Sequence, residues 1–386
     1  MRYRFWGAKG SKGSKVLSAF FLAVLIIVLV GFSLLATNFK DIGNLVKVIF
    51  LVKGQYLWEV ESTELVDGAI KGLVESLDDP YSVYLEPSTF KQLRETIQGS
   101  FAGLGLLVGM DGQNIVVVQS FKETPASKAG LTRGDIITAI DDKEVTGMDL
   151  ETAVSLMRGP VGTSVKIAIY RPGKDKSYEF TLTREEINVP TVEGTLLGEN
   201  KTGYIVLSQF TEKTVAELDS VVARLSKEGV KGIVLDLRNN PGGELNAAVN
   251  VAGYFVPEGP VVYIDYRTGK DEVRTANGNF IGLPLVVLVN ERSASASEIL
   301  AGAIKDAKTG TLVGTNTFGK GLVQTAYPLG NGAGLKLTVA RYMTRNKNDI
   351  NKKGIPPDIE VEQPDDSLKD YQLEKALEIM QEKLSR

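Results

Sequence analysis

The fold of this chain depends on one corner and on a second short segment that follows it. The corner reads Asn290-Glu291-Arg292-Ser293-Ala294-Ser295-Ala296-Ser297-Glu298, and the second segment reads Gly319-Lys320-Gly321-Leu322-Val323-Gln324. An apolar run, Leu283 to Val289, precedes the corner, and apolar residues at helical spacing follow it from Ile299 to Ile304. This order predicts a buried strand that turns directly into a helix.

A serine at such a corner has two chemical uses. Ser295 with Glu298 fits a capping box, in which the two side chains bind backbone amides of the first helical turn. Alternatively, the hydroxyl group is a nucleophile, and the amide of Ala296 faces the oxyanion that forms. The residues of the corner alone leave both uses open, and they do not distinguish Ser295 from Ser293 or Ser297.

The composition limits which base could activate a serine. The chain has no histidine and no cysteine, which excludes Ser-His-Asp and Cys-His sites and zinc sites built on these residues. Lysine is the known substitute, but at a pKa of about 10.4 only roughly one lysine in 2,500 is neutral at pH 7. Burial lowers that pKa. Lys320 has apolar neighbours, and Gln324 would share its face in an extended strand; an exposed turn is the alternative setting for Lys320.

The corner and the second segment resemble the motifs of the carboxy-terminal processing (tail-specific) serine protease family. Both motifs match, and so does the spacing of 25 residues between Ser295 and Lys320. The resemblance selects Ser295 among the three serines. It implies that Ser295 is the nucleophile, that Lys320 is the general base and that Gln324 holds the lysine.

The beginning of the chain predicts a membrane anchor. Residues 1–15 contain five basic residues and no acidic residue, and residues 16–36 form an uncharged run of 21 residues. At about 1.5 Å per residue such a helix crosses a hydrocarbon core of about 30 Å. Residues 1–40 are therefore predicted to comprise a basic cytoplasmic tail and a transmembrane signal anchor, and the basic flank predicts that the catalytic part lies outside the cytoplasm. A cleaved signal peptide is the alternative, although the run is long and Ala36 ends a poor cleavage site.

Two helices are predicted in the region 41–98. Apolar residues recur at helical spacing from Leu45 to Tyr56 and from Val66 to Leu77. Pro80 then forces Asp79 out of the helical region, so that the acidic pair Asp78-Asp79 is predicted to form a solvated turn rather than a metal site. In the family that the chain resembles, helices at this position contribute to a dimer.

A match to another class of enzyme lies further along. Ser88 and Lys91 fit the S-x-x-K motif of penicillin-interacting serine acyltransferases, and Lys-Thr-Gly occurs at residues 201–203 and 308–310. The chain lacks the third motif, Ser-Asp-Asn. Ser88 follows a proline and precedes a polar helical pattern, so it is predicted to be an N-cap.

Residues 99–184 resemble a PDZ domain. Gly103-Leu104-Gly105-Leu106 begins a strand, and Pro125 to Leu131 and Gly134 to Ile137 resemble two further signatures of such domains. The glycines let backbone amides form a concavity for a carboxylate, and the strand can pair with a peptide tail. Leu104, Leu106, Val154 and Met157 are predicted to line the groove for an apolar C-terminus. Arg158 resembles a family position that signals tail binding to the protease.

Residues 185–362 alternate strands and helices. Strands are expected at Tyr204 to Phe210, Gly232 to Leu237, Val261 to Tyr266 and Leu283 to Val289. Helices at Thr214 to Lys227 and Glu244 to Tyr254 complete a βαβ pattern, for which the resemblance implies a crotonase-like α/β fold. Residues 236–243 match the family motif D-L-R-x-N-x-G-G, which implies that the amides of Gly242 and Ala296 form the oxyanion hole. In residues 363–386, Leu373, Leu377, Met380 and Leu384 predict a helix with an apolar face, which packs either on its own domain or on a second copy.

These observations predict a multidomain α/β protein. With 386 residues, 43% of them hydrophobic, the chain can build several cores. Together with the predicted anchor, the resemblance implies a membrane-anchored serine endopeptidase of a bacterial cell membrane that is a homodimer, cleaves proteins or peptides with free apolar C-termini and uses no cofactor and no metal. The net charge of −3 argues against nucleic acid as a partner. A PDZ adaptor without activity is the alternative from another class.

Overall fold

The computed structural model describes residues 42–385 apart from 175, 268, 365 and 366. The predicted anchor at residues 16–36 lies outside these residues. Among the described helices, none combines the length and the apolar character needed to cross a membrane. The chain divides into two compact units, one that ends at Leu77 and one that begins at Asp78, and each is described by itself.

The first unit contains the two predicted helices, α2 (Ile42–Gln55) and α3 (Ser62–Glu75). All residues of α2 are at least partly exposed, and several large apolar side chains, among them Phe50, Leu57 and Trp58, are exposed in or just after it. In α3 only Val74 is buried. The described part of this unit thus buries little of its own apolar surface.

The second unit begins with the short strand β1 (Val83–Leu85) and the helix α4 (Pro87–Gln98). The prediction that Ser88 caps α4 is wrong: the N-cap is Glu86, and Pro87 occupies the first helical position. Proline suits that position because it has no amide hydrogen to leave unpaired and its φ is already helical. Ser88 and Lys91 both lie exposed on α4.

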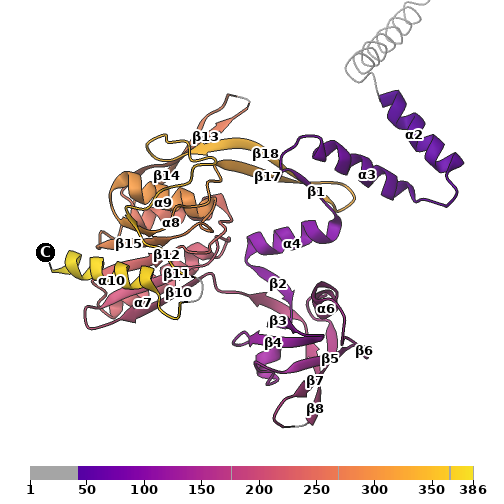
Figure 1. Ribbon diagram of the computed structural model, residues 1–386, viewed down its shortest axis with the longest axis horizontal. Helices are drawn as coiled ribbons and strands as arrows, with labels where there is room; N and C mark the ends of the chain where they lie inside the picture. The colour runs from indigo at the N-terminus through magenta and orange to yellow at the C-terminus, as the bar shows by residue number, and fades with distance from the viewer. Residues whose placement is uncertain (1–41, 175, 268, 365–366, 386) are drawn as a thin grey trace, which may run out of the picture. The chain divides into compact units, whose positions relative to one another are not determined.

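A small β domain follows (Figure 1). Its elements are β2 (Ser100–Gly103), β3 (Leu106–Asp111), β4 (Asn114–Ser120), α5 (Pro125–Lys128), β5 (Ile136–Ile140), β6 (Lys143–Glu144), α6 (Leu150–Met157), β7 (Ser164–Arg171), β8 (Lys176–Thr183) and β9 (Glu185–Asn188). One sheet has the order β3-β4-β5-β7-β8, with β6 paired to β5, and β2 pairs with β9. Fully buried residues such as Ile115, Val117 and Ile167 form its core.

The larger α/β domain is built on a six-stranded sheet of order β10-β11-β12-β15-β16-β19. The strands are β10 (Val192–Leu197), β11 (Thr202–Leu207), β12 (Gly232–Asp236), β15 (Leu285–Val289), β16 (Thr311–Gly314) and β19 (Ile359–Glu360). From β11 to β19 all neighbours are parallel. The carboxyl ends of β12 and β15 therefore meet at one edge, where ligand sites of such sheets form.

Helices cover both faces of this sheet. They are α7 (Thr214–Lys227), α8 (Leu245–Phe255), α9 (Ala296–Ala307) and α10 (Tyr371–Leu384). Alternate residues of β12 serve different cores: Ile233 and Leu235 pack in the cluster with α8 and α9, whereas Val234 packs with Ala376 and Met380 of α10. Burial on both faces is typical of a parallel sheet. Of the two settings expected for the last helix, its own domain or a second copy, α10 packs on its own domain (Figure 1).

A second sheet has the order β1-β18-β13-β14, and β17 pairs with β18. Its further strands are β13 (Gly259–Tyr266), β14 (Glu272–Ala276), β17 (Leu322–Pro328) and β18 (Gly334–Met343). The segment Val261 to Tyr266 is a strand as predicted, but it belongs to this antiparallel sheet and not to the parallel one. Periodicity in a strand reports burial, and it carries no information about the partner strand.

Candidate active site

The serine corner lies between the carboxyl end of β15 and the first turn of α9. Ser295 precedes α9 with a φ of 56°, which is a strained conformation for serine. Ser293 and Ser297 are fully buried, and their hydroxyl groups donate to the carbonyl oxygens of Leu237 at 2.8 Å and Asn240 at 2.9 Å. Ser295 is half-buried. Of the three serines in the corner, Ser295 is the one that remains accessible.

The glycine turn after β12 comes into contact with this corner. Gly242 has a φ of +99°, and a Cβ atom added to it would lie 2.7 Å from the Ala294 carbonyl oxygen and 2.9 Å from the Ala296 nitrogen. Only glycine permits so close an approach. The Gly242 amide donates to Asn240 Oδ1 at 2.9 Å, whereas no described residue accepts a hydrogen bond from the Ala296 amide. In this conformation the Ala296 amide is open to an oxyanion and the Gly242 amide is engaged.

Glu298 joins the two motifs. Its carboxylate is fully buried, and Ser295 and Glu298 form the predicted capping box. Oε2 accepts the backbone amides of Ser295 and Lys320, each at 2.9 Å. Oε1 accepts the Thr317 hydroxyl group at 2.6 Å and the Gly319 amide at 2.7 Å. One oxygen atom thus binds the backbones of the predicted nucleophile and of the predicted base.

Tyr342 of β18 makes a second connection between the same two backbones. Its hydroxyl group donates to the carbonyl oxygens of Ser295, at 3.0 Å, and of Lys320. The ring is buried, and burial, with the nearby charge of Glu298, raises the pKa of Tyr342 well above its usual value. Tyr342 therefore stays a hydrogen-bond donor throughout the neutral range.

Lys320 lies in a partly desolvated setting. Its side chain is half-buried, and Nζ lies 4.9 Å from the centroid of the Tyr81 ring. Burial lowers the pKa of Lys320, the positive charge of Lys336 lowers it further, and the charges of Glu298 and Asp79 offset part of this decrease. The net effect favours the neutral amine, which is the form that can accept a proton.

The side chains of the predicted dyad are not hydrogen-bonded to each other. Among the described residues, no hydrogen bond joins Lys320 Nζ to the Ser295 hydroxyl group or to Gln324. Catalytic hydrogen bonds are often formed only once substrate is bound. Gln324 donates to Thr338 Oγ1 at 3.3 Å. Strand alternation does not place Lys320 and Gln324 on one face, because β17 begins only at Leu322 and its pairing is irregular before Gln324.

The acidic pair forms the predicted turn. Asp78 has a φ of 51°, and the Asp79 carboxylate accepts the Tyr81 amide at 3.1 Å and the Ser82 hydroxyl group at 2.6 Å. Within the described residues, no group of three or more Asp or Glu side chains is placed to hold a metal ion. Asp79 instead contributes negative charge near Lys320.

The predicted tail-binding residues lie at the β2–β3 turn and on α6. They are Gly103, Leu104, Gly105, Leu106, Val154 and Met157. Leu104 and Met157 are buried in the core of the small domain, whereas Leu106 and Val154 are half-buried against it. The carbonyl oxygens of Leu104 and Gly105 bind amides of the following segment at 3.0 Å and 2.9 Å, which fixes the turn. Leu106 and Val154 are the members of this set that can present apolar atoms to a ligand.

Arg158, the last of the predicted functional residues, caps the carboxyl end of α6. Its guanidinium group lies 3.8 Å from the Glu95 carboxylate of α4 and 5.2 Å from the centroid of the Phe101 ring. Arg158 also lines a cavity of about 290 Å³ with Thr191 and Gln209 of the larger domain. It therefore lies where the small domain, α4 and the larger domain meet.

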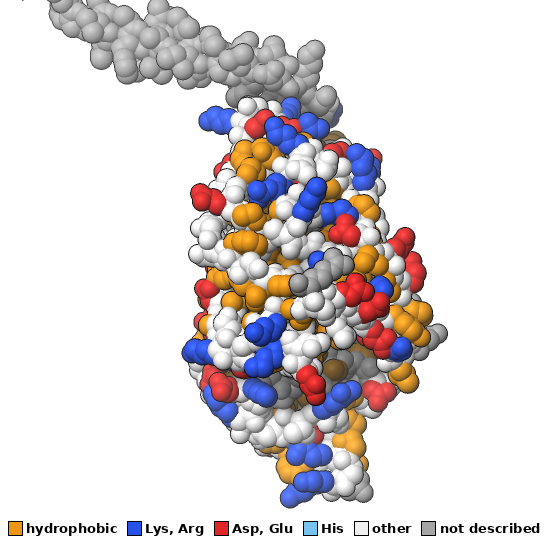
Figure 2. Space-filling model, turned by 90° about the vertical axis from the view of Figure 1, so that its left-hand side faces the viewer, with side chains coloured by type: hydrophobic (Ala, Val, Ile, Leu, Met, Phe, Trp, Pro, Cys, Tyr) orange, Lys and Arg blue, Asp and Glu red, His pale blue; other side chains and the backbone are white. Residues whose placement is uncertain are grey.

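Sequence reasoning missed several residues of this site. Glu298 was interpreted only as a cap, although a buried carboxylate that follows the candidate nucleophile was the available signal. Tyr81, Lys336 and Tyr342 lie outside every motif, and they reach the site only through the second sheet. On the face in Figure 2, basic and acidic side chains are interspersed.

Three stretches of the chain match known protein families. Residues 201–361 match Peptidase family S41, residues 116–171 match the PDZ domain, and residues 34–89 match the Activating protease CtpB N-terminal domain. The family S41 match contains the serine corner, the glycine turn and Lys320. The fold and site together with these matches define a serine-type peptidase that carries a PDZ domain.

Relatives of known name cover most of the chain. Carboxy-terminal processing protease CtpB of Bacillus subtilis is 40% identical over 84% of this chain and 69% of its own length. The carboxyl-terminal-processing protease of Synechocystis is 41% identical over 77% and 71%. The structure of the photosystem II D1 C-terminal processing protease is 38% identical over 80% of this chain and 85% of its own, with a TM-score of 0.50. The chain belongs to the carboxy-terminal processing protease family.

Proposed function

We propose that this protein is a membrane-anchored endopeptidase that acts outside the cytoplasm with a Ser295–Lys320 dyad, on substrates whose C-terminal tails its PDZ domain selects. One observation carries the dyad. Ser295 is the accessible serine of the corner, and Glu298 and Tyr342 bind its backbone together with the backbone of Lys320. This arrangement fixes the spacing of two residues whose side chains must meet over a substrate.

The proposed chemistry begins with a proton transfer. The neutral Lys320 amine takes the proton of the Ser295 hydroxyl group as the oxygen attacks a peptide carbonyl carbon. The Ala296 amide stabilises the resulting oxyanion, and the Gly242 amide joins it once it is released from Asn240. The lysine then gives its proton to the leaving amine. Water, deprotonated by the same lysine, hydrolyses the acyl-enzyme. Gln324 is proposed to orient the lysine when substrate is bound.

The location rests on the first forty residues. The uncharged run 16–36 is long enough to anchor the chain in the cell membrane of a bacterium, and the basic residues before it favour a cytoplasmic N-terminus. The exposed apolar side chains of α2 and α3 fit a second copy of the chain, so that a homodimer is part of the proposal. Proteins or peptides with free apolar C-termini are the proposed substrates.

The dyad is tested by substitution in the full chain. Ser295→Ala and Lys320→Ala should each abolish cleavage of an unfolded reporter protein without unfolding the enzyme. The double variant should lose no more than either single variant, because the two residues act as a unit. Ser220→Ala and Lys227→Ala, at exposed positions of α7, are the matched controls and should keep full activity. Cleavage by Lys320→Ala at the wild-type rate would exclude the dyad.

A further inference from the structure

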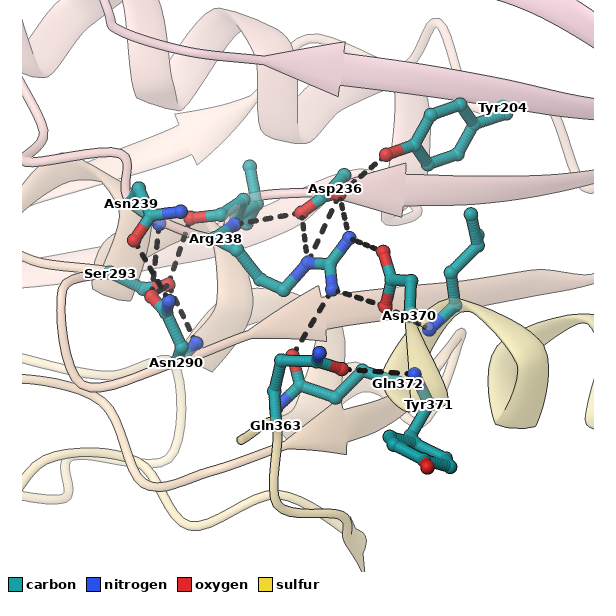
Figure 3. A network of polar contacts seen from close by, with 12 residues as sticks. Tyr204, Asp236, Arg238, Asn239, Asn290, Ser293, Gln363, Asp370, Tyr371 and Gln372 are labelled. Atoms are coloured by element: carbon teal, nitrogen blue, oxygen red, sulfur yellow. Dashed lines mark hydrogen bonds and ion pairs between the residues drawn. The ribbon is translucent and has the colours of Figure 1, made fainter. Parts of the chain in front are cut away.

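The guanidinium group of Arg238 connects the glycine turn after β12 (residues 238–243) to the last helix, α10 (Figure 3). Nη1 and Nη2 bind the two carboxylate oxygens of Asp370 at 2.8 Å and 2.9 Å, and Nη1 also binds Gln372 Oε1 at 3.2 Å. Nη2 and Nε bind the Asp236 carboxylate at 2.6–3.1 Å. Arg238 is the first residue of the turn after β12, whereas Asp370 is the N-cap of α10.

The charges of Arg238 and Asp236 lie largely out of water, whereas the Asp370 side chain is 39% exposed. The exposed fraction of the side chain is 13% for Arg238 and 7% for Asp236, and Tyr204 donates to Asp236 at 2.7 Å. Asp236 also accepts the backbone amide of Arg238 at 2.9 Å, so that it fixes the start of the turn. A bidentate pair has a well-defined geometry, and the loss of Asp370 would leave the buried Arg238 guanidinium group with fewer partners.

The glycine turn is also hydrogen-bonded to the serine corner. The backbone amide of Asn239 donates to Asn290 Oδ1 at 2.9 Å, and Asn290 Nδ2 donates to Asn239 Oδ1 at 3.0 Å (Figure 3). The carbonyl oxygen of Asn240 accepts the Ala294 amide at 3.0 Å and the Ser297 hydroxyl group at 2.9 Å. Polar contacts therefore run without a break from α10, through Arg238 and the turn, to the residues on either side of Ser295.

We propose that Arg238 and Asp370 are a positioning pair, through which the docked last helix holds the 238–243 turn in register with the serine corner. The inference rests on the proposed function, because it assumes that this turn and Ala296 bind the oxyanion. Neither residue touches substrate. Since the oxyanion exists only in the transition state, a loosened turn should lower kcat and leave KM nearly unchanged.

Asp370→Asn is the decisive substitution. Asparagine is as good an N-cap as aspartate, so the bond from the Leu373 amide to the N-cap side chain is kept while the charge and one side of the bidentate pair are lost. We expect kcat to fall on the order of tenfold, less than the 10²–10³ measured when an oxyanion donor itself is removed. Affinity for a peptide boronate, which forms a tetrahedral adduct with the serine, should fall in parallel. Arg238→Lys should reproduce both effects, and the double variant should add little.

The control is Glu378→Gln, which breaks the exposed Lys375–Glu378 pair on the same helix and should leave kcat unchanged. Hydrogen exchange gives a readout that is independent of catalysis, because the amides of residues 238–240, 242 and 243 should exchange faster in Asp370→Asn while those of the small domain do not change. Wild-type kcat and wild-type exchange in Asp370→Asn would overturn the positioning pair and leave the dyad intact. Full activity of Ser295→Ala would overturn the dyad, and the exchange experiment would still decide whether the pair holds the turn.

Discussion

Two buried side chains determine how the predicted nucleophile and base are held. Glu298 binds their amides and Tyr342 binds their carbonyl oxygens. The lysine itself lies against Tyr81 and near the charge of Lys336. Because only the neutral amine accepts a proton, we expect the charges around Lys320 to set the pH at which the proposed dyad works.

Removal of a positive charge near Lys320 should move the pH profile. Burial first and Lys336 second lower the pKa of Lys320, so activity should rise with pH through a value below that of free lysine. Lys336→Gln should raise the pKa of Lys320 and shift the rising limb of kcat/KM to higher pH. Lys227→Gln is the control, because it changes the net charge by the same amount at an exposed position of α7. A profile that does not move would show that Lys320 is not the titrating base.

Loss of the Glu298 charge should affect both stability and activity. In Glu298→Gln one oxygen becomes an amide nitrogen that faces two donors, so these buried groups lose their acceptor. We expect a decrease in the free energy of unfolding of about 1–3 kcal/mol and a large loss of kcat, measured by denaturant unfolding and by cleavage of a peptide. Glu374→Gln on the exposed side of α10 should change neither quantity. An unchanged kcat would mean that the backbones of Ser295 and Lys320 do not need this carboxylate.

At the scale of elements, the site forms where two parallel strands end side by side. β12 leads into the glycine turn and β15 into the serine corner, and helices α8 and α9 begin directly afterwards. Their close approach depends on Gly242, whose neighbours are the Ala294 carbonyl group and the Ala296 amide. In this conformation the Gly242 amide donates its hydrogen bond to the Asn240 side chain.

A methyl group at position 242 should remove activity by occupying the space in front of the Ala296 amide. Gly242→Ala adds a Cβ within 3 Å of three atoms of the corner and is strained at a φ of +99°. Gly278→Ala carries a comparable strain, at a φ of +83°, with no atom within 4 Å. We expect each variant to lose about 1–3 kcal/mol of stability from backbone strain, and Gly242→Ala to lose more because its Cβ also meets backbone atoms of the corner. Only Gly242→Ala should lose kcat, by 10² or more. Equal activity of the two folded variants would argue against an oxyanion site at this turn.

At the scale of the whole molecule, we expect the small domain to signal to the protease domain through Arg158. Its guanidinium group lies near Glu95 of α4 and lines a cavity with residues of the larger domain. A tail bound along β3 and α6 lies on the same domain as this contact. A ligand that binds one arrangement of the domains better shifts the population toward it.

A free tail should therefore activate the enzyme. We expect an uncleavable peptide with an apolar C-terminus to accelerate cleavage of a tailless substrate, and amidation of a substrate's C-terminus to slow its own cleavage. Arg158→Ala should abolish the activation and keep peptide binding, measured by calorimetry. Lys128→Ala, at another exposed site of the small domain, should retain both. Inhibition by the added peptide would mean that the domain only tethers its substrate, which acts by local concentration.

The sequence by itself determined the local elements and the chemistry that remained possible. Helical periodicity, the capping box of Ser295 with Glu298 and the absence of histidine are properties of neighbouring residues or of composition, and they need no knowledge of packing. Tertiary structure decided which serine stays accessible, which sheet receives Val261 to Tyr266, and how Lys320 is desolvated. Those features depend on residues far apart in the chain, such as Tyr81 and Tyr342, whose encounter is fixed by strand pairing and burial and leaves no periodic signal in the sequence.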